Sequence, residues 1–224
     1  FIIDDMIFAV KAKNEILGVP NASMITPMKY WLQSKLSPNS DIKIVDESVE
    51  TSIIAVQGPK SPDVISKILG RKNAVDRFRC REISSNDLEI SGWIQGTGYT
   101  GERGFEIFLS SNDARKIWKS IVEFTDIDTK PVGLGARDTL RLEKGYLLSG
   151  QDFIWPGLEN NQSDKFPNNF LHRNISETSV PFGLDLKHDF IGKETTLKYL
   201  KSSSRLIGLI CEEKGPSPRP GHAV

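Results

Sequence analysis

The segment from Gly96 to Glu106 constrains the fold more than any other part of this chain. It carries four glycines in nine residues, between two short apolar runs that we predict to be strands, 93–95 and 104–109. It contains G-x-G but neither the G-x-G-x-x-G dinucleotide signature nor a P-loop, and no helix follows it directly. Two interpretations stay open: an ordinary glycine-rich hairpin, or a tight loop that lets the backbone approach a ligand. For a ligand, Tyr99 offers a ring for stacking and Glu106 a two-oxygen acceptor.

The remaining pattern predicts an α+β fold rather than a doubly wound parallel sheet, because strands and helices alternate irregularly and strands come in hairpin-like pairs. Residues 1–10 and 16–19 are predicted as two strands around a polar turn. Further predictions are strands at 41–46, 51–56, 78–83 and 205–211, helices at 23–35, from Ser61, from Ser111, at 133–148 and from near Gly192, and a long surface loop at 151–177. The hydroxyls of Ser61 and Ser111 are predicted to cap the helices that begin there.

Composition excludes several function classes. Lysine plus arginine equals aspartate plus glutamate, 29 each, so the balance of charge favours neither nucleic acid nor a membrane surface as a partner. The two cysteines form no CxxC pair and the three histidines lack metal-ligand spacing, so we expect no metal site. Any anionic ligand must therefore be held by a local site.

Two constellations carry candidate chemistry. Asp4 and Asp5 interrupt the first apolar run, and strand alternation puts one carboxylate on each face, where a buried one is either satisfied or functional. Arg137 and Arg141 lie four residues apart on one predicted helix face. They are either part of a salt-bridged surface helix or an arginine fork for a ligand carboxylate.

Taken together, these segments resemble the glycine-cleavage T-protein (aminomethyltransferase) family. GYTGE at 98–102 with GLGARD at 133–138 and LRLE at 140–143 is specific in combination. The other matching segments are 2–5, 19–22, 56–59, 104–106, 150–152 and 189–193. They follow the family's order over nearly the whole chain, which begins inside an apolar run and ends in turn-rich sequence. We therefore expect a fragment that lacks the family's N-terminal part and most of its C-terminal domain. We expect this fragment alone to be inactive as an aminomethyltransferase.

The resemblance implies a folate-binding, multi-domain fold with discontinuous domains. Residues 1–22 and 48–150 would form the middle folate-binding domain, residues 23–47 and 151–195 part of the first domain, and residues 196–224 the start of a C-terminal β-barrel-like domain. The implied reaction transfers the aminomethyl carbon from a lipoyl group on the carrier H protein to tetrahydrofolate. Ammonia is released and 5,10-methylenetetrahydrofolate forms in glycine cleavage. The implied compartment is the cytoplasm in a prokaryote or the mitochondrial matrix in a eukaryote.

The resemblance also implies the site residues. The family motif selects Asp5 rather than Asp4 as the catalytic carboxylate. Folate-binding positions are implied for Asn21, Tyr99, Glu106, Arg137 and Tyr146.

The chain departs from the family pattern at three positions and in one loop. Gly96 stands where many members have arginine, Arg103 where they have an acidic residue, and Ala9 where tyrosine is frequent; the loop 154–175 is longer than usual.

Two alternatives stay open. One is a non-catalytic folate-binding relative that repairs iron–sulfur clusters, although 144–152 lacks the cysteine of that group. The other is a T-protein-like demethylase or methyltransferase, or the folate domain of an amine dehydrogenase. Ammonia release from an aminomethylated carrier, against methyl transfer from a methylated amine or sulfonium, separates these alternatives.

Overall fold

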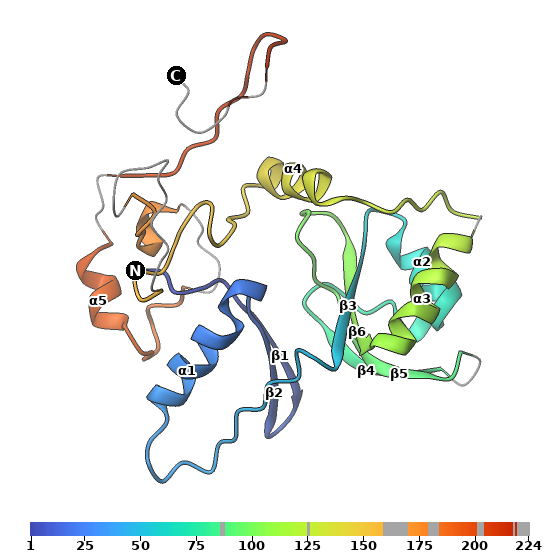
Figure 1. Cartoon of the computed structure of the whole chain (residues 1–224), viewed down its shortest axis with the longest axis horizontal. Helices are drawn as coiled ribbons and strands as arrows, with labels where there is room; N and C mark the ends of the chain where they lie inside the picture. Colours follow the sequence, from blue (N-terminus) through green and yellow to red (C-terminus); the bar gives the residue numbers. More distant parts are fainter. Residues whose placement is uncertain are drawn as a thin grey trace. The chain divides into compact units, whose positions relative to one another are not determined.

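The computed structural model describes residues 1–85, 88–124, 126–158, 170–178, 184–200, 204–216 and 218. It has a mixed α and β architecture, as predicted (Figure 1). The strands are β1 (Ile7–Ala12), β2 (Glu15–Val19), β3 (Thr51–Gln57), β4 (Cys80–Ser85), β5 (Ile90–Gln95) and β6 (Gly104–Ser110). The α-helices are α1 (Ile25–Lys35), α2 (Ser61–Leu69), α3 (Ser111–Glu123), α4 (Leu134–Lys144) and α5 (Lys193–Lys198), and short 3-10 helices lie at Ala22–Met24, Arg71–Asn73 and Ile175–Glu177.

The chain forms two compact units. Unit 1 comprises Phe1–Asp5, Pro20–Met28 and Gly145–Val224, and unit 2 comprises Met6–Val19 and Lys29–Lys144. The domain boundaries predicted from the sequence stay predictions.

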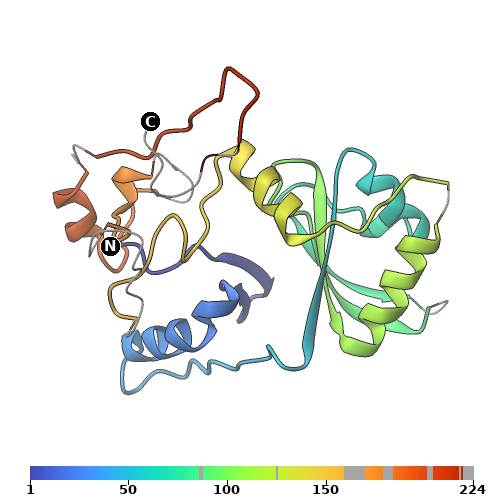
Figure 2. The same ribbon diagram turned by 45° about the horizontal axis from the view of Figure 1, so that its top comes forward.

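Unit 2 contains a four-stranded antiparallel sheet in the order β3-β6-β5-β4. Alternate strand residues point to one face, where α2 and α3 cover them, and both views show the two helices on the same side of the sheet (Figures 1 and 2). The core between the layers is apolar and includes Ile65, Ile94, Phe105, Ile107 and Ile117, all fully buried. Glu106, between two core residues on β6, therefore points to the opposite face of the sheet.

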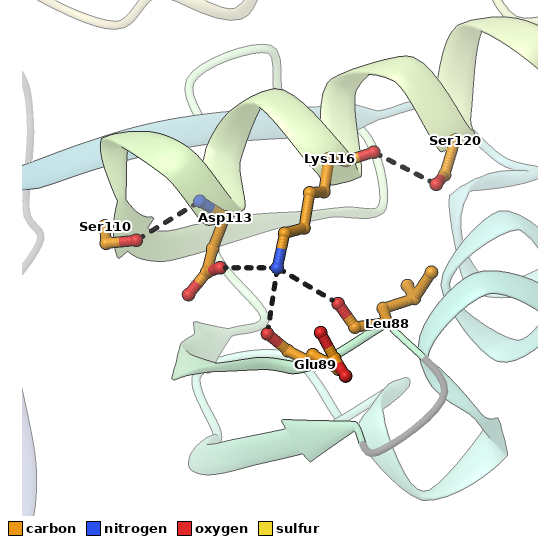
Figure 3. Close-up of polar contacts among 6 residues, drawn as sticks. All are labelled: Leu88, Glu89, Ser110, Asp113, Lys116 and Ser120. Carbon is orange, nitrogen blue, oxygen red and sulfur yellow. Dashed lines mark hydrogen bonds and ion pairs between the residues drawn. The ribbon is translucent and has the colours of Figure 1, made fainter.

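The start of α3 is fixed by polar contacts that Figure 3 shows. Ser110 accepts a hydrogen bond from the backbone N–H of Asp113, so the N-cap is Ser110 rather than the predicted Ser111 (Figure 3). Lys116 Nζ donates to the carbonyl oxygens of Glu89 at 3.1 Å and Leu88 at 3.4 Å, and lies 3.4 Å from Asp113 Oδ1. Lys116 thus ties the β4–β5 connection to α3.

At the predicted start of α2, Ser61 has a different role from the one expected. The N-cap is Lys60, and Ser61 is the first helical residue. Its buried hydroxyl donates to the carbonyl oxygen of Arg103 at 2.9 Å. The hydroxyl therefore fastens α2 to the glycine-rich loop instead of capping the helix.

The β1–β2 hairpin, also in unit 2, packs beside β4. Lys11 Nζ lies 5.6 Å from the ring centroid of Trp93, and the Cys80 thiol lies 3.8 Å from the carbonyl oxygen of Val10. The strand predicted over residues 1–10 begins only at Ile7, because its pairing with β2 ends at Ile7 and Val19.

Three other expectations were wrong. Residues 41–46 and 205–211 form no strand, because neither takes part in a ladder of hydrogen bonds with another described strand. The segment 151–177 is not wholly a surface loop, since Phe153, Ile154 and Leu171 are buried and Ile154 N donates to Leu171 O at 2.8 Å. The C-terminal β-barrel-like domain stays a prediction.

Among the described helices, none has the length and apolar character needed to cross a bilayer.

Candidate functional site

The predicted catalytic residue Asp5 lies in unit 1, in the extended segment before β1. This segment is held by unit 1 itself: Ile2 N donates to Arg173 O at 2.8 Å, and Arg173 Nε donates to Asp152 O at 2.8 Å. Asp4 and Asp5 are therefore not part of a paired strand, and the argument that they must point to opposite faces was wrong.

Both carboxylates instead converge on Asn21. The side-chain Nδ2 of Asn21 donates to Asp4 Oδ1 at 2.7 Å and to Asp5 Oδ1 at 2.6 Å. Its backbone N–H donates to Asp4 Oδ2 at 3.0 Å. The amide nitrogen carries two hydrogens, one for each carboxylate. Asn21 thus bridges the two aspartates and fixes their spacing.

The electrostatics of this cluster bring Asp5 into the range of acid–base chemistry. Although Asp5 remains accessible to solvent, desolvation by the surrounding chain raises its pKa to about 6. The Asn21 hydrogen bond opposes this rise, and the negative charges of Asp4 and Asp152 add to it. Desolvation also raises the pKa of Asp4, against the hydrogen bonds from Asn21. A carboxyl group with a pKa of about 6 changes its charge close to neutral pH.

Asp152 also belongs to this neighbourhood, although the sequence did not predict it as a site residue. Its Oδ2 accepts a hydrogen bond from Leu148 N at 2.8 Å, which fixes the turn after α4. The matching motif at 150–152 contained this residue, but periodicity gave no sign that it lies near Asp5. Tyr146, another predicted position, is half-buried in unit 1, one residue after Gly145, whose φ of 77° ends α4.

Glu106 lies in unit 2, in the middle of the sheet face that α2 and α3 leave open. The pairing register places it between Ala55 of β3 and Gln95 of β5. Thr97 Oγ1 donates to Glu106 Oε2, and Gln95 Nε2 donates to the same oxygen at 3.3 Å. Within the described ranges, no side chain donates to Glu106 Oε1.

Tyr99 and Arg137 come together although they are far apart in the sequence. The guanidinium carbon of Arg137 lies 4.4 Å from the ring centroid of Tyr99. Arg137 forms no ion pair with any residue in the described part of the chain, whereas Arg141 is buried and paired through Nε with Asp138 Oδ1 at 2.7 Å. The two arginines therefore do not act as one fork: Arg141 pairs within α4, and Arg137 stacks on the loop.

Unit 2 offers a chemically suitable place for the pterin-like ring of a folate. Glu106 Oε1 can accept hydrogen bonds from amino and ring N–H groups, and Tyr99 presents a flat surface. Gln95 Oε1 is a buried acceptor without a hydrogen-bond partner, beside the same carboxylate. The donors and acceptors present thus fit a planar ligand that carries several N–H groups.

The predicted site residues divide between the units. Asp5, Asn21 and Tyr146 belong to unit 1, and Tyr99, Glu106 and Arg137 belong to unit 2. Sequence reasoning missed Asp4 as a partner of Asn21, and Thr97 and Gln95 as partners of Glu106. Gln95 could have been found from the sequence, because it stands just before the glycine-rich loop and Glu106 stands at the end of it, so the two residues are opposite each other in a hairpin.

Comparison with known proteins gives consistent matches. Residues 1–155 match the family model described as the GCVT N-terminal domain. The chain is 32% identical to an aminomethyltransferase from Halothermothrix orenii over 230 residues, which cover 100% of the chain and 58% of the relative. It is 33% identical to the aminomethyltransferase of Bacillus subtilis, over 99% of the chain and 58% of the relative. The chain thus spans somewhat more than half the length of these curated relatives.

A solved structure agrees with these matches. The crystal structure of the glycine cleavage system aminomethyltransferase T from Bartonella henselae has a TM-score of 0.58 and 30% identity, over 67% of this chain and 39% of that one. Together with the family model, which matches more than half of the chain, this similarity shows that the chain belongs to the glycine-cleavage T-protein family.

Proposed function

We propose that this protein transfers an aminomethyl carbon from the lipoyl arm of a carrier H protein to tetrahydrofolate. The observation that carries the proposal is the Asp4–Asn21–Asp5 cluster, in which a carboxyl group with a pKa of about 6 is held by an amide that bridges it to a second carboxylate. The family's names for its members as aminomethyltransferases support this reaction class.

In the reaction, the carbon of an S–CH₂–NH₂ group loses its bonds to sulfur and to nitrogen. It gains bonds to N5 and N10 of tetrahydrofolate. The two N–H protons of the folate go to the departing amine, which leaves as ammonia, and to the lipoyl sulfur, which becomes a thiol. Atoms and charges balance without an oxidant or a metal.

Asp5 would act on the charges that develop during these steps. Its carboxylate would orient a folate N–H and stabilise the positive charge that appears on nitrogen as the carbon is transferred. Asn21 would keep that carboxylate in place by its hydrogen bond at 2.6 Å. Three side chains would bind the folate. Glu106 would accept hydrogen bonds from its N–H groups, Tyr99 would stack on its ring, and Arg137 would offer its guanidinium fork.

The test uses the full-length protein with an aminomethylated lipoyl carrier and tetrahydrofolate, and it measures ammonia together with 5,10-methylenetetrahydrofolate. Equal amounts of both products are expected. Glu106→Gln should weaken tetrahydrofolate binding, while Glu102→Gln, an exposed carboxylate of the same loop, should not. Methyl transfer from a methylated amine or sulfonium, without ammonia from the carrier, would favour the demethylase alternative and refute the proposal.

A further inference from the structure

Gln57, the last residue of β3, spans the two ends of the glycine-rich loop. Its side-chain Nε2 donates to the carbonyl oxygen of Thr97 at 3.2 Å and to that of Phe105 at 3.0 Å. Thr97 lies just after β5, and Phe105 lies in β6. A single amide group therefore closes the mouth of the loop, using both of its hydrogens.

Two of the loop glycines leave room for this amide. A Cβ atom added at Gly98 or at Gly104 would lie 1.9 Å from Gln57 Oε1. Neither residue has a positive φ in the left-handed region, whereas Gly101 has a φ of 76°. Gly98 and Gly104 are therefore required for space, and Gly101 for backbone conformation.

The amide cannot turn over in its place. A rotation by 180° about the last side-chain bond would direct Oε1 at two carbonyl oxygens and remove both hydrogen bonds that Nε2 donates. Oε1 itself is buried and has no hydrogen-bond partner, which costs free energy. The side chain thus keeps an orientation that the loop carbonyls determine.

The loop ends that Gln57 holds are those that carry Glu106. Thr97 donates through its hydroxyl to the Glu106 carboxylate, and Phe105 is the residue before Glu106. We propose that Gln57 is a positioning residue, which sets the loop and the Glu106 carboxylate in the geometry that receives the ligand's N–H groups. The inference rests on the proposed function for the identity of that ligand, tetrahydrofolate.

The first experiment needs no ligand. Unfolding free energies are measured for Gly104→Ala in the wild-type protein and in a Gln57→Ala background. In the wild type the methyl group collides with the amide, and in Gln57→Ala it enters the vacated space, so the destabilisation should largely disappear. Gly101→Ala is the matched control, because its penalty comes from φ and from the Lys144 stem, and it should be equal in both backgrounds. An equal penalty for Gly104→Ala in both backgrounds would overturn the steric argument.

The second experiment measures the dissociation constant of tetrahydrofolate by titration calorimetry. Gln57→Met keeps the length of the side chain but removes both N–H donors. It should raise the dissociation constant by about tenfold, which corresponds to the free energy of roughly one hydrogen bond between uncharged groups. In a Glu106→Gln background, the same substitution should add little, because the carboxylate that Gln57 positions is gone.

The outcomes separate the two proposals. No binding of tetrahydrofolate to the wild-type protein would refute the proposed function. The comparison of Gly104→Ala in the wild-type and Gln57→Ala backgrounds would still decide how Gln57 acts on the loop. Wild-type binding that is unchanged in Gln57→Met would overturn the positioning role alone. A tenfold loss that is equal in the Glu106→Gln background would show that Gln57 acts on general stability and would also overturn it.

Discussion

Replacing Asp4 by asparagine tests whether the aspartate pair acts as a unit. Asp4 accepts two N–H groups of Asn21, at 2.7 and 3.0 Å, while Asp5 accepts one at 2.6 Å. An asparagine at position 4 has one acceptor oxygen, so at least one of these hydrogen bonds is lost and an amide NH₂ faces an N–H donor. A hydrogen bond to a charged group contributes about 1.5–3 kcal/mol. With discount for the partial exposure of the cluster, we expect a loss of about 1 kcal/mol in the alignment of Asn21.

The substitution also changes the pKa of Asp5. The negative charge of Asp4 is one of the causes that raise this pKa, after desolvation, so its removal should lower the pKa of Asp5 from about 6. If ionised Asp5 stabilises developing positive charge, kcat/KM rises as the pH passes through the pKa of Asp5. The acid limb of the profile should lie near pH 6 in the wild type and at lower pH in Asp4→Asn.

The assay is the pH dependence of kcat/KM for tetrahydrofolate in the full-length enzyme, with an aminomethylated carrier as the donor. Asp4→Asn should lose about fivefold at pH 8, which corresponds to the 1 kcal/mol of lost alignment, and its acid limb should move down. Asp5→Asn should lose roughly ten- to a thousandfold and show no acid limb near 6. Asp63→Asn, an exposed carboxylate of α2, is the control and should resemble the wild type. Full activity and an unmoved limb in Asp4→Asn would refute the coupling between the two aspartates.

Three further predictions concern binding and stability. Because the folded-state pKa of Asp5 exceeds its unfolded value of 3.8, the contribution of Asp5 to stability is present below pH 3.8 and is lost as the pH rises through 6. Between pH 4 and pH 7, the unfolding free energy of Asp5→Asn should therefore rise by about 1 kcal/mol relative to that of the wild type, a value discounted for solvent exposure. A difference between the two proteins that does not change with pH would contradict the raised pKa. Arg137→Lys should raise the dissociation constant of tetrahydrofolate about tenfold, since lysine offers neither the planar fork nor the same stacking on Tyr99, with the exposed Arg115→Lys as control. Lys116→Met should lower the free energy of unfolding by about 1 kcal/mol in urea titrations, because two carbonyl contacts are lost (Figure 3). Lys119→Met, whose Nζ lies 3.8 Å from Glu123, should change it by no more than about 0.5 kcal/mol.

Local pattern was sufficient where an element carries its own signal. The apolar faces of α2 and α3 follow helical spacing, and β3 and β6 are short, mostly apolar runs, so these elements were predicted close to their observed bounds. The local pattern failed where strand formation depends on a pairing partner elsewhere in the chain. Residues 41–46 alternate as a strand does, but an isolated strand has no ladder of hydrogen bonds, and no described segment pairs with this one.

The same limit explains the error at Asp4 and Asp5. The apolar run from Ile2 to Val10 predicts one strand, yet Ile2 donates a backbone hydrogen bond to Arg173, which lies far away in the sequence. Only the structure reveals that both carboxylates meet at Asn21. Asp5, Asn21 and Arg137 were predicted as site residues from the family resemblance. The residues that contact them could not be predicted from the spacing of residues in the sequence.

Gly96 and Arg103, two of the departures from the family pattern, lie beside each other in the structure. A Cβ atom at Gly96 would lie 2.2 Å from the carbonyl oxygen of Asp76 and 3.2 Å from Arg103 Nη1, so the space beside residue 96 is already taken. The Arg103 guanidinium fills it by donating to the carbonyl oxygen of Val75 and to that of Gly104 at 3.3 Å, while it stacks 4.5 Å from the Phe105 ring centroid. An arginine at the base of the glycine-rich loop is thus present at residue 103. A side chain at position 96 would require the backbone at Asp76 to shift, and Arg103 Nη1 would also be in tight contact with it.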